Sequence, residues 1–166
     1  EQGAETILIS GPTQLPSPSG VTVKHVNSAL EMLAACKEFL PADIVICAAA
    51  VADWRIANPN INKIKKNGEL PVLELIENPD ILLQISQLTK NRPYLVIGFA
   101  AETQDLIKNA QAKLSKKGCD WIMANDVSPE SGTFNGEKNT IHIISKDKTE
   151  AWPTLTKEVV GQKLST

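Results

Sequence analysis

The sequence contains 166 residues, of which 42% are hydrophobic and 22% are charged, and its formal net charge is −2. This size and composition predict a single globular domain over residues 1–166 with a core of its own. The slightly negative net charge excludes a general affinity for nucleic acid, so a basic site would have to be local. The apolar runs are too short to cross a membrane, and the first residues do not read as a signal peptide, which predicts a cytoplasmic protein.

Hydrophobic periodicity predicts strands that alternate with helices along the chain. An irregular segment is expected at 50–69 and a polar loop at 126–139. The run at 43–49 is apolar throughout, which indicates a strand buried on both faces. In chain order, the expected strands lie at 6–10, 21–26, 43–49, 71–77, 94–100, 120–125 and 140–145, and the expected helices at 28–40, 78–88, 103–118 and 154–164.

Three of the predicted helices carry terminal signals. Ser28 and Glu31 have the spacing of a capping box at the start of the first helix. Asn78 and Pro79 are expected as the cap and the first residue of the second. Gly118 is expected to end the third, because glycine readily adopts the left-handed conformation that closes many helices.

The alternation of strands and helices predicts an α/β domain with a mainly parallel central sheet, a Rossmann-like three-layer sandwich. Ligands of such sheets bind at the carboxyl ends of the strands, where "AAAVADWR" (48–55), "GFAAET" (98–103) and "ANDV" (124–127) fall. Neither GxGxxG nor GxxxxGK[ST] occurs, and residues 1–10 read as the end of a first helix followed by a second strand. We therefore expect that a first β-loop-α unit of about 30 residues is absent from this sequence.

The patterns around the cysteines and histidines favour ordinary structural roles over metal binding or nucleophilic chemistry. Cys36, Cys47 and Cys119 form no CxxC pair and read as reduced core thiols, which is typical of a reducing compartment. His25 and His142 lie in alternating strand patterns, and neither HExxH nor GxSxG occurs. The sequence therefore favours neither a histidine metal site nor a serine nucleophile.

Lysines and one aspartate are the stronger candidates, although each has a second interpretation. The lysines of "INKIKK" (61–66) either bind an anion or form a solvated loop. Lys113 and Lys117 share one helix face, which favours an anion between them or a simple interaction with the helix dipole. Asp53 follows a run of small residues at a strand end, where it could bind Mg²⁺ or a ribose hydroxyl, or serve as a turn residue.

Six motifs, taken in chain order, resemble phosphopantothenate–cysteine ligase. They are "AAAVADWR", "KIKK" (63–66), "NPDIL" (78–82), "GFAAET", the lysine pair and "ANDVSPESGTFN" (124–135). This is the phosphopantothenoylcysteine synthetase domain, often fused in bacteria to a phosphopantothenoylcysteine decarboxylase. The resemblance covers essentially the whole chain. It implies a homodimer of the coenzyme A pathway that uses CTP and Mg²⁺, with no flavin on this domain.

The resemblance also implies a reaction and a set of site residues. The carboxylate of 4′-phosphopantothenate attacks the α-phosphate of CTP to give an acyl-cytidylate and pyrophosphate, and the amine of L-cysteine then displaces CMP. Lys63 corresponds to a catalytic lysine of the activation step, and Asp53 to a nucleotide-site aspartate that could also hold Mg²⁺. The remaining expected nucleotide contacts are Pro79, Asp80, Ile81, Leu82, Phe99, Lys113 and Lys117, with Ala49 and Ala50 lining the site.

Two other classes of protein fit the predicted fold. A Rossmann-type NAD(P)-binding oxidoreductase could carry its glycine fingerprint in the absent first unit. A hydride-transfer site, however, does not need the many cations that a triphosphate site needs. A non-catalytic flavodoxin-like interaction domain would show no thermal shift with any nucleotide.

Overall fold

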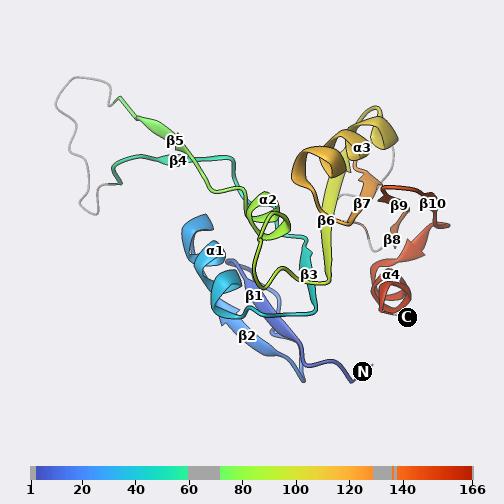
Figure 1. The fold of residues 1–166 in the computed structure, drawn as a ribbon, viewed down its shortest axis with the longest axis horizontal. Coiled ribbons are helices and arrows are strands. Elements are labelled where there is room, and N and C mark those ends of the chain that lie inside the picture. Colours follow the sequence, from blue (N-terminus) through green and yellow to red (C-terminus); the bar gives the residue numbers. More distant parts are fainter. Residues whose placement is uncertain (1–2, 60–71, 129–135, 137, 166) are drawn as a thin grey trace.

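The computed structural model describes residues 3–59, 72–128, 136 and 138–165, which form an α/β fold (Figure 1). The helices are α1 (Ala29–Glu38), α2 (Ile81–Ser86), α3 (Leu106–Lys117) and α4 (Lys157–Leu164). The strands are β1 (Ile7–Ser10), β2 (Thr22–His25), β3 (Ile44–Cys47), β4 (Trp54–Ile56), β5 (Leu75–Glu77), β6 (Leu95–Glu102), β7 (Trp121–Asp126), β8 (Lys138–Asn139), β9 (Ile141–Ser145), β10 (Thr149–Ala151) and β11 (Leu155–Thr156).

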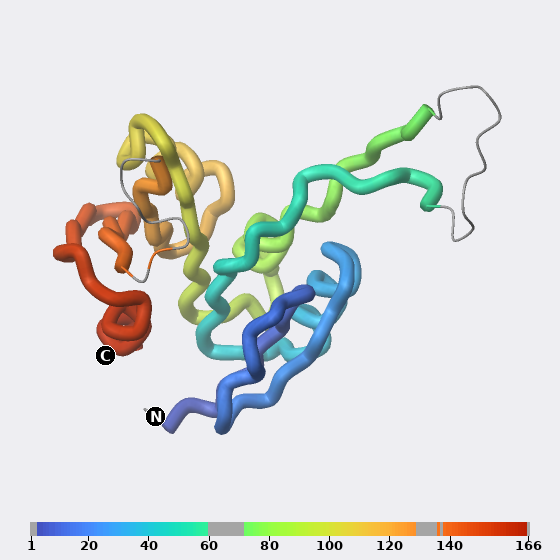
Figure 2. Tube along the Cα trace, turned by 180° about the vertical axis from the view of Figure 1, so that it is seen from behind, coloured from blue at the N-terminus to red at the C-terminus, as the bar shows by residue number. Residues whose placement is uncertain are grey.

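The central sheet has five strands in the order β10-β9-β7-β6-β3. β3, β6 and β7 are parallel to one another. β9 pairs antiparallel with β7, and β10 pairs antiparallel with β9 at the far edge. β1 and β2 form a separate parallel pair, and β4 and β5 form an antiparallel arm that runs away from the rest of the chain (Figures 1 and 2). The predicted mainly parallel α/β architecture is therefore confirmed.

Two buried clusters lie on opposite faces of this sheet and make it three-layered. On one face Val96 of β6 and Ile122 of β7 pack in a cluster with residues of α1, α2 and α3. On the other face Ile97 and Met123, the next residues along the same strands, pack with Val160 of α4. Adjacent strand residues point to opposite faces, so one apolar run serves both layers.

The expectation that 43–49 is buried on both faces is wrong in the described structure. Val45 and Cys47 pack against the cluster beneath α1–α3, but the side chains of Ile44 and Ile46 are 54% and 49% exposed. β3 is the edge strand of the five-stranded sheet, and the buried cluster on its second face includes none of its residues. The apolar run therefore reflects a strand with only one covered face.

The start of α2 also differs from the prediction. Asp80 is the N-cap, and its Oδ1 accepts a hydrogen bond from the N–H of Leu83 at 3.0 Å. Asn78 and Pro79 lie before the helix, because the Asn78 side chain is hydrogen-bonded to carbonyl groups of the segment that follows β3. The helix is therefore shorter at its start than the sequence pattern indicated.

The other predicted helix signals are confirmed, with one change of partner. Ser28 caps α1 by accepting the N–H of Glu31, but the Glu31 carboxylate accepts the N–H of Asn27 at 2.8 Å rather than that of Ser28. Gly118 closes α3 in the left-handed conformation at φ 70°. The short strands β4, β8, β10 and β11 were not predicted, because two or three residues are too few to show an alternating pattern.

The three cysteines are free thiols in or beside the first core cluster. Burial raises the pKa of Cys36 and Cys119, and burial, with a smaller contribution from the Asp80 carboxylate, raises the pKa of Cys47 to about 12. These thiols are therefore protonated and weakly nucleophilic at neutral pH, as expected of core cysteines. None of the helices in the described part of the chain has the length and apolar character needed to cross a membrane.

Gly98 allows α2 to approach β6 closely. A Cβ atom built on Gly98 would lie 2.5 Å from Cδ2 of Leu82 and 2.9 Å from Cδ1 of Ile122. We expect Gly98→Ala to lower the free energy of unfolding by about 1–3 kcal/mol, because the added methyl group overpacks this contact. Chemical denaturation of Gly98→Ala, Leu82→Ala and the double variant measures the loss in the free energy of unfolding for each. Strictly additive losses in the double variant would contradict the proposed steric contact.

Candidate functional site

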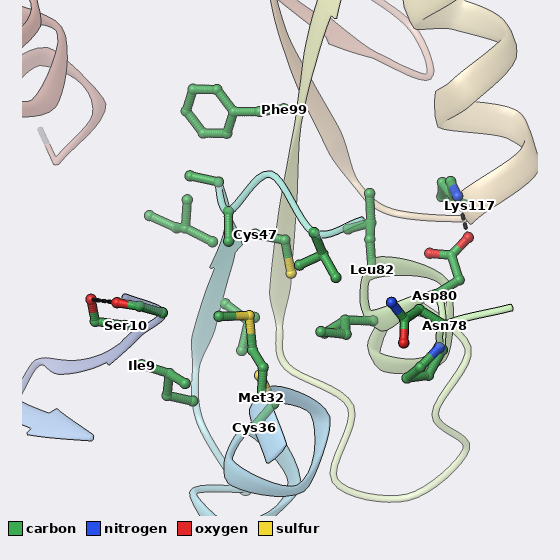
Figure 3. A pocket seen from close by; sticks show the side chains of 18 of the residues that line it. Ile9, Ser10, Met32, Cys36, Cys47, Asn78, Asp80, Leu82, Phe99 and Lys117 are labelled. Carbon is green, nitrogen blue, oxygen red and sulfur yellow. Dashed lines mark hydrogen bonds and ion pairs between the residues drawn. The ribbon is translucent and has the colours of Figure 1, made fainter. Parts of the chain in front are cut away.

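A cavity of about 960 Å³ opens where the ends of several elements meet (Figure 3). Its walls come from β1, α1, β3, the segment after β3, the start of α2, the middle of β6 and the last turns of α3. It runs along β1 and β3 as far as Ser10 and Gly11 at the carboxyl end of β1 and Cys47 and Ala48 at that of β3. The cavity therefore reaches the strand ends at which parallel α/β sheets bind ligands.

Asp80 and Lys117 form the central charged contact of this cavity. The Lys117 ammonium donates a hydrogen bond to Oδ2 of Asp80, while Oδ1 of the same carboxylate caps α2 (Figure 3). Their side chains are 33% and 18% exposed. Burial by itself would raise the pKa of Asp80, but the Lys117 ammonium and the Leu83 N–H outweigh it, so the pKa of Asp80 is lowered from its ordinary value. Asp80 is therefore an anion at neutral pH.

Lys113 lies one turn before Lys117 and also faces a protein oxygen. Its ammonium donates a hydrogen bond of 2.8 Å to the backbone carbonyl of Phe99 in β6. Both predicted lysines thus lie inside the cavity and point from α3 toward β6 and α2 rather than into bulk water. Lys116 lines the cavity as well, which places three cations of one helix at the same wall.

Asp53 also lines the cavity, in the exposed segment between β3 and β4. Its carbonyl accepts the backbone N–H of Asn78 at 2.8 Å, which connects this segment to the start of α2. Among the described residues no group of three His, Cys, Asp or Glu side chains could hold a metal ion. A single carboxylate fits Mg²⁺ that is coordinated largely by nucleotide phosphates and water, and it does not fit an all-protein metal cage.

The cavity collects most of the residues expected from the sequence. Ala50 is absent from its walls, and Lys63, like the rest of "INKIKK", lies outside the described residues. Sequence reasoning missed Asn78 as a wall residue; its position beside Pro79-Asp80 was interpreted only as a helix cap. The expected residues that line the cavity are Ala49, Asp53, Pro79, Asp80, Ile81, Leu82, Phe99, Lys113 and Lys117.

The charge of Asp80 can be tested without removing the cap, because asparagine is an equally good N-cap residue. We expect Asp80→Asn to be less stable than the parent by about 1 kcal/mol at pH 7. A carboxylate with a lowered folded-state pKa stabilises the fold above the pKa of its unfolded form, and this contribution is lost as the pH falls through the lowered value. The difference between the two proteins should therefore be constant above about pH 5 and shrink in more acidic solution.

Urea denaturation of both proteins from pH 7 down to the acid limit of the folded state measures this difference. Lys117→Gln is the matched variant, since it removes the positive charge of the same Asp80–Lys117 ion pair. A difference between parent and Asp80→Asn that does not depend on pH would contradict a stabilising charge on Asp80.

Known proteins were compared with the chain. The profile of the family described as the DNA/pantothenate metabolism flavoprotein C-terminal domain matches residues 1–166. The coenzyme A biosynthesis bifunctional protein CoaBC of Vibrio cholerae is 42% identical over 163 residues, which cover 96% of this chain and 40% of that protein. The protein of the same name from Escherichia coli is 40% identical over 167 residues, covering 98% of this chain and 41% of that protein. The chain thus spans about two fifths of the length of these relatives.

Solved structures agree with this relationship. A crystal structure of the C-terminal domain of coenzyme A biosynthesis bifunctional protein CoaBC superposes with a TM-score of 0.77 at 35% identity, over 98% of this chain and 71% of that one. The DNA/pantothenate metabolism flavoprotein from Streptococcus pneumoniae has a TM-score of 0.76 at 21% identity, over 98% of this chain and 80% of that one, and supports the fold alone. Because the profile covers every residue of the sequence, the chain belongs to the family of DNA/pantothenate metabolism flavoprotein C-terminal domains.

Proposed function

We propose that this domain acts in coenzyme A biosynthesis as a CTP-dependent phosphopantothenate–cysteine ligase. The observation that carries the proposal is the cavity that reaches the strand ends, whose walls include the α3 lysines Lys113, Lys116 and Lys117 together with Asp53 and Phe99. The lysines suit a triphosphate, and the Asp53 carboxylate suits a ribose hydroxyl or a phosphate-bound Mg²⁺. The names of the relatives, which are coenzyme A biosynthesis proteins, support the same pathway.

The reaction follows from the chemistry of a carboxylate, which is a poor electrophile until one of its oxygens belongs to a leaving group. The carboxylate of 4′-phosphopantothenate forms a bond to the α-phosphorus of CTP, and the bond to the bridging oxygen of pyrophosphate breaks. The cysteine amine then attacks the acyl carbon, loses a proton and expels CMP. Both substrates are anions, so the first step requires cations that offset their repulsion.

The lysines of α3 are proposed to provide part of that charge. Lys113 and Lys117 already donate hydrogen bonds to oxygen acceptors, a backbone carbonyl and a carboxylate, and an ammonium group can donate to phosphate oxygens in the same way. A triphosphate would compete with these acceptors, and the Asp80 carboxylate would keep Lys117 in place while the cavity is empty. Pro79, Ile81 and Leu82 would form the apolar wall beside it.

Mg²⁺ would supply charge neutralisation at the triphosphate, with Asp53 as its protein ligand. Lys63 is proposed as the catalytic lysine of the activation step on sequence resemblance alone. A homodimer, and association with a phosphopantothenoylcysteine decarboxylase domain, are proposed on the same basis. The free thiols of the described chain support a reducing compartment such as the cytoplasm.

The first β-loop-α unit that is expected beyond this sequence would have a place beside this cavity. β1 and β3 both line it, and each pairs along one edge only among the described strands. Ile44 and Ile46 of β3 are exposed there. A further strand between these two edges would satisfy their backbone groups, and its loop would lie at the mouth of the cavity.

Nucleotide binding is the first test of the proposal. CTP with Mg²⁺ should raise the melting temperature of the full-length protein, whereas NADPH should not. Replacing Lys113 and Lys117 by glutamine should weaken CTP binding by about 1–3 kcal/mol, because charge-assisted hydrogen bonds are lost. The matched control replaces Lys90 and Lys108, which are exposed and lie away from the cavity. A shift with NADPH alone would favour the oxidoreductase, and a shift with neither would favour the interaction domain.

Turnover is the second test. The full-length protein should release pyrophosphate from CTP when 4′-phosphopantothenate is present without cysteine, and should release CMP once cysteine is added. Lys63→Gln should bind CTP but form the acyl-cytidylate much more slowly, because an ammonium that offsets the approach of two anions is gone. A single-turnover assay with labelled CTP measures both steps. An unchanged rate of acyl-cytidylate formation in Lys63→Gln would remove that lysine from the activation step.

A further inference from the structure

We propose that Asn78 is a positioning residue for the nucleotide site, because its side chain fixes the segment that carries Asp53. The inference depends on the proposed function, which makes this cavity a CTP site. Asn78 lies between the end of β5 and the cap of α2, beside Asp80 (Figure 3), and both its backbone and its side chain are hydrogen-bonded to the chain that follows β3.

The contacts of Asn78 surround Asp53 on both sides. Its Nδ2 donates to the carbonyl of Ala52 at 2.8 Å and to that of Trp54 at 3.3 Å. Its backbone N–H donates to the carbonyl of Asp53 itself at 2.8 Å. Three consecutive carbonyl groups are thus held by one residue, so the peptide planes on either side of Asp53 have defined orientations. The exposed Asp53 side chain projects from a backbone that is fixed although it lies in no helix or strand.

Arg55 completes the arrangement from the β4 side. Its Nη1 donates to the carbonyl of Glu77 and, at 3.4 Å, to Oδ1 of Asn78. The Asn78 amide therefore uses both of its hydrogens and its oxygen, which only an asparagine or glutamine amide can do. An aspartate of the same shape would keep the oxygen that faces Arg55 but would place a second oxygen against the two carbonyl groups.

The same residue connects the Asp53 segment to the lysines of α3. Asn78 contacts residues 52–54 and is followed by Pro79 and by Asp80, whose carboxylate binds Lys117. A change at Asn78 would therefore alter how Asp53 lies relative to these lysines, without removing the Asp53 carboxylate or an ammonium group. Because a misplaced binding group binds its ligand less tightly, the expected loss falls on CTP.

The test compares Asn78→Ala and Asn78→Asp with the parent in the full-length protein. We expect the KM for CTP to rise at least about tenfold in both variants, with kcat and the KM values for 4′-phosphopantothenate and cysteine within about twofold of the parent. A general loss of folded protein would instead lower the apparent kcat and leave the KM for CTP unchanged. Circular dichroism melting of each variant accompanies the kinetics.

Asn109→Ala is the matched control. The Asn109 Nδ2 also donates two hydrogen bonds, to Oε2 of Glu102 and to the carbonyl of Gln104, but Asn109 does not line the cavity. Its KM for CTP should match that of the parent. An unchanged KM for CTP in folded Asn78→Asp, or failure of both Asn78 variants to fold, would overturn the positioning role. If the parent itself consumes no CTP, the proposed function fails instead.

Discussion

The Asp80 carboxylate is the contact on which the arrangement of this site depends. One of its oxygens caps α2, and the other binds the ammonium of Lys117 on α3. Two helices that are separated in sequence by β6, and that also pack in the same core cluster, are thereby joined by an ion pair. The ion pair is only partly buried, so its two charges keep enough solvent contact to avoid a large desolvation cost while still setting the helix positions.

This arrangement explains how the fold holds a cluster of cations at one place. Lysines four residues apart on a helix repel one another, and each would normally turn toward solvent. Here each has an oxygen acceptor within the fold, a carboxylate for Lys117 and a backbone carbonyl for Lys113. The protein thus uses its own oxygens to hold the ammonium groups where phosphate oxygens are proposed to bind. Neither interpretation of the lysine pair from the sequence, an anion between them or an interaction with the helix dipole, included these protein acceptors.

The open edges of β1 and β3 are a second feature of this site. An edge strand with exposed isoleucines is a poor end to a sheet, because its backbone groups and apolar side chains remain available for pairing. In this fold those edges border the cavity rather than a distant surface. This chain covers 71% of the related crystal structure of a CoaBC C-terminal domain.

The sequence by itself determined the order of the major strands and helices, because periods of 2 and 3.6 residues record which side chains meet a core. Nine of the eleven site residues that the sequence resemblance implied line the cavity, since they fall in short motifs that the fold brings together. The sequence could not show that Asn78 contacts carbonyl groups more than 20 residues away, so this residue was mistaken for a helix cap. It could not show that β3 is an edge strand either, since an apolar run is the same whether or not both faces are covered. Only the tertiary structure decides such matters, because partners distant in sequence, rather than local pattern, determine what a polar side chain binds and which faces are buried.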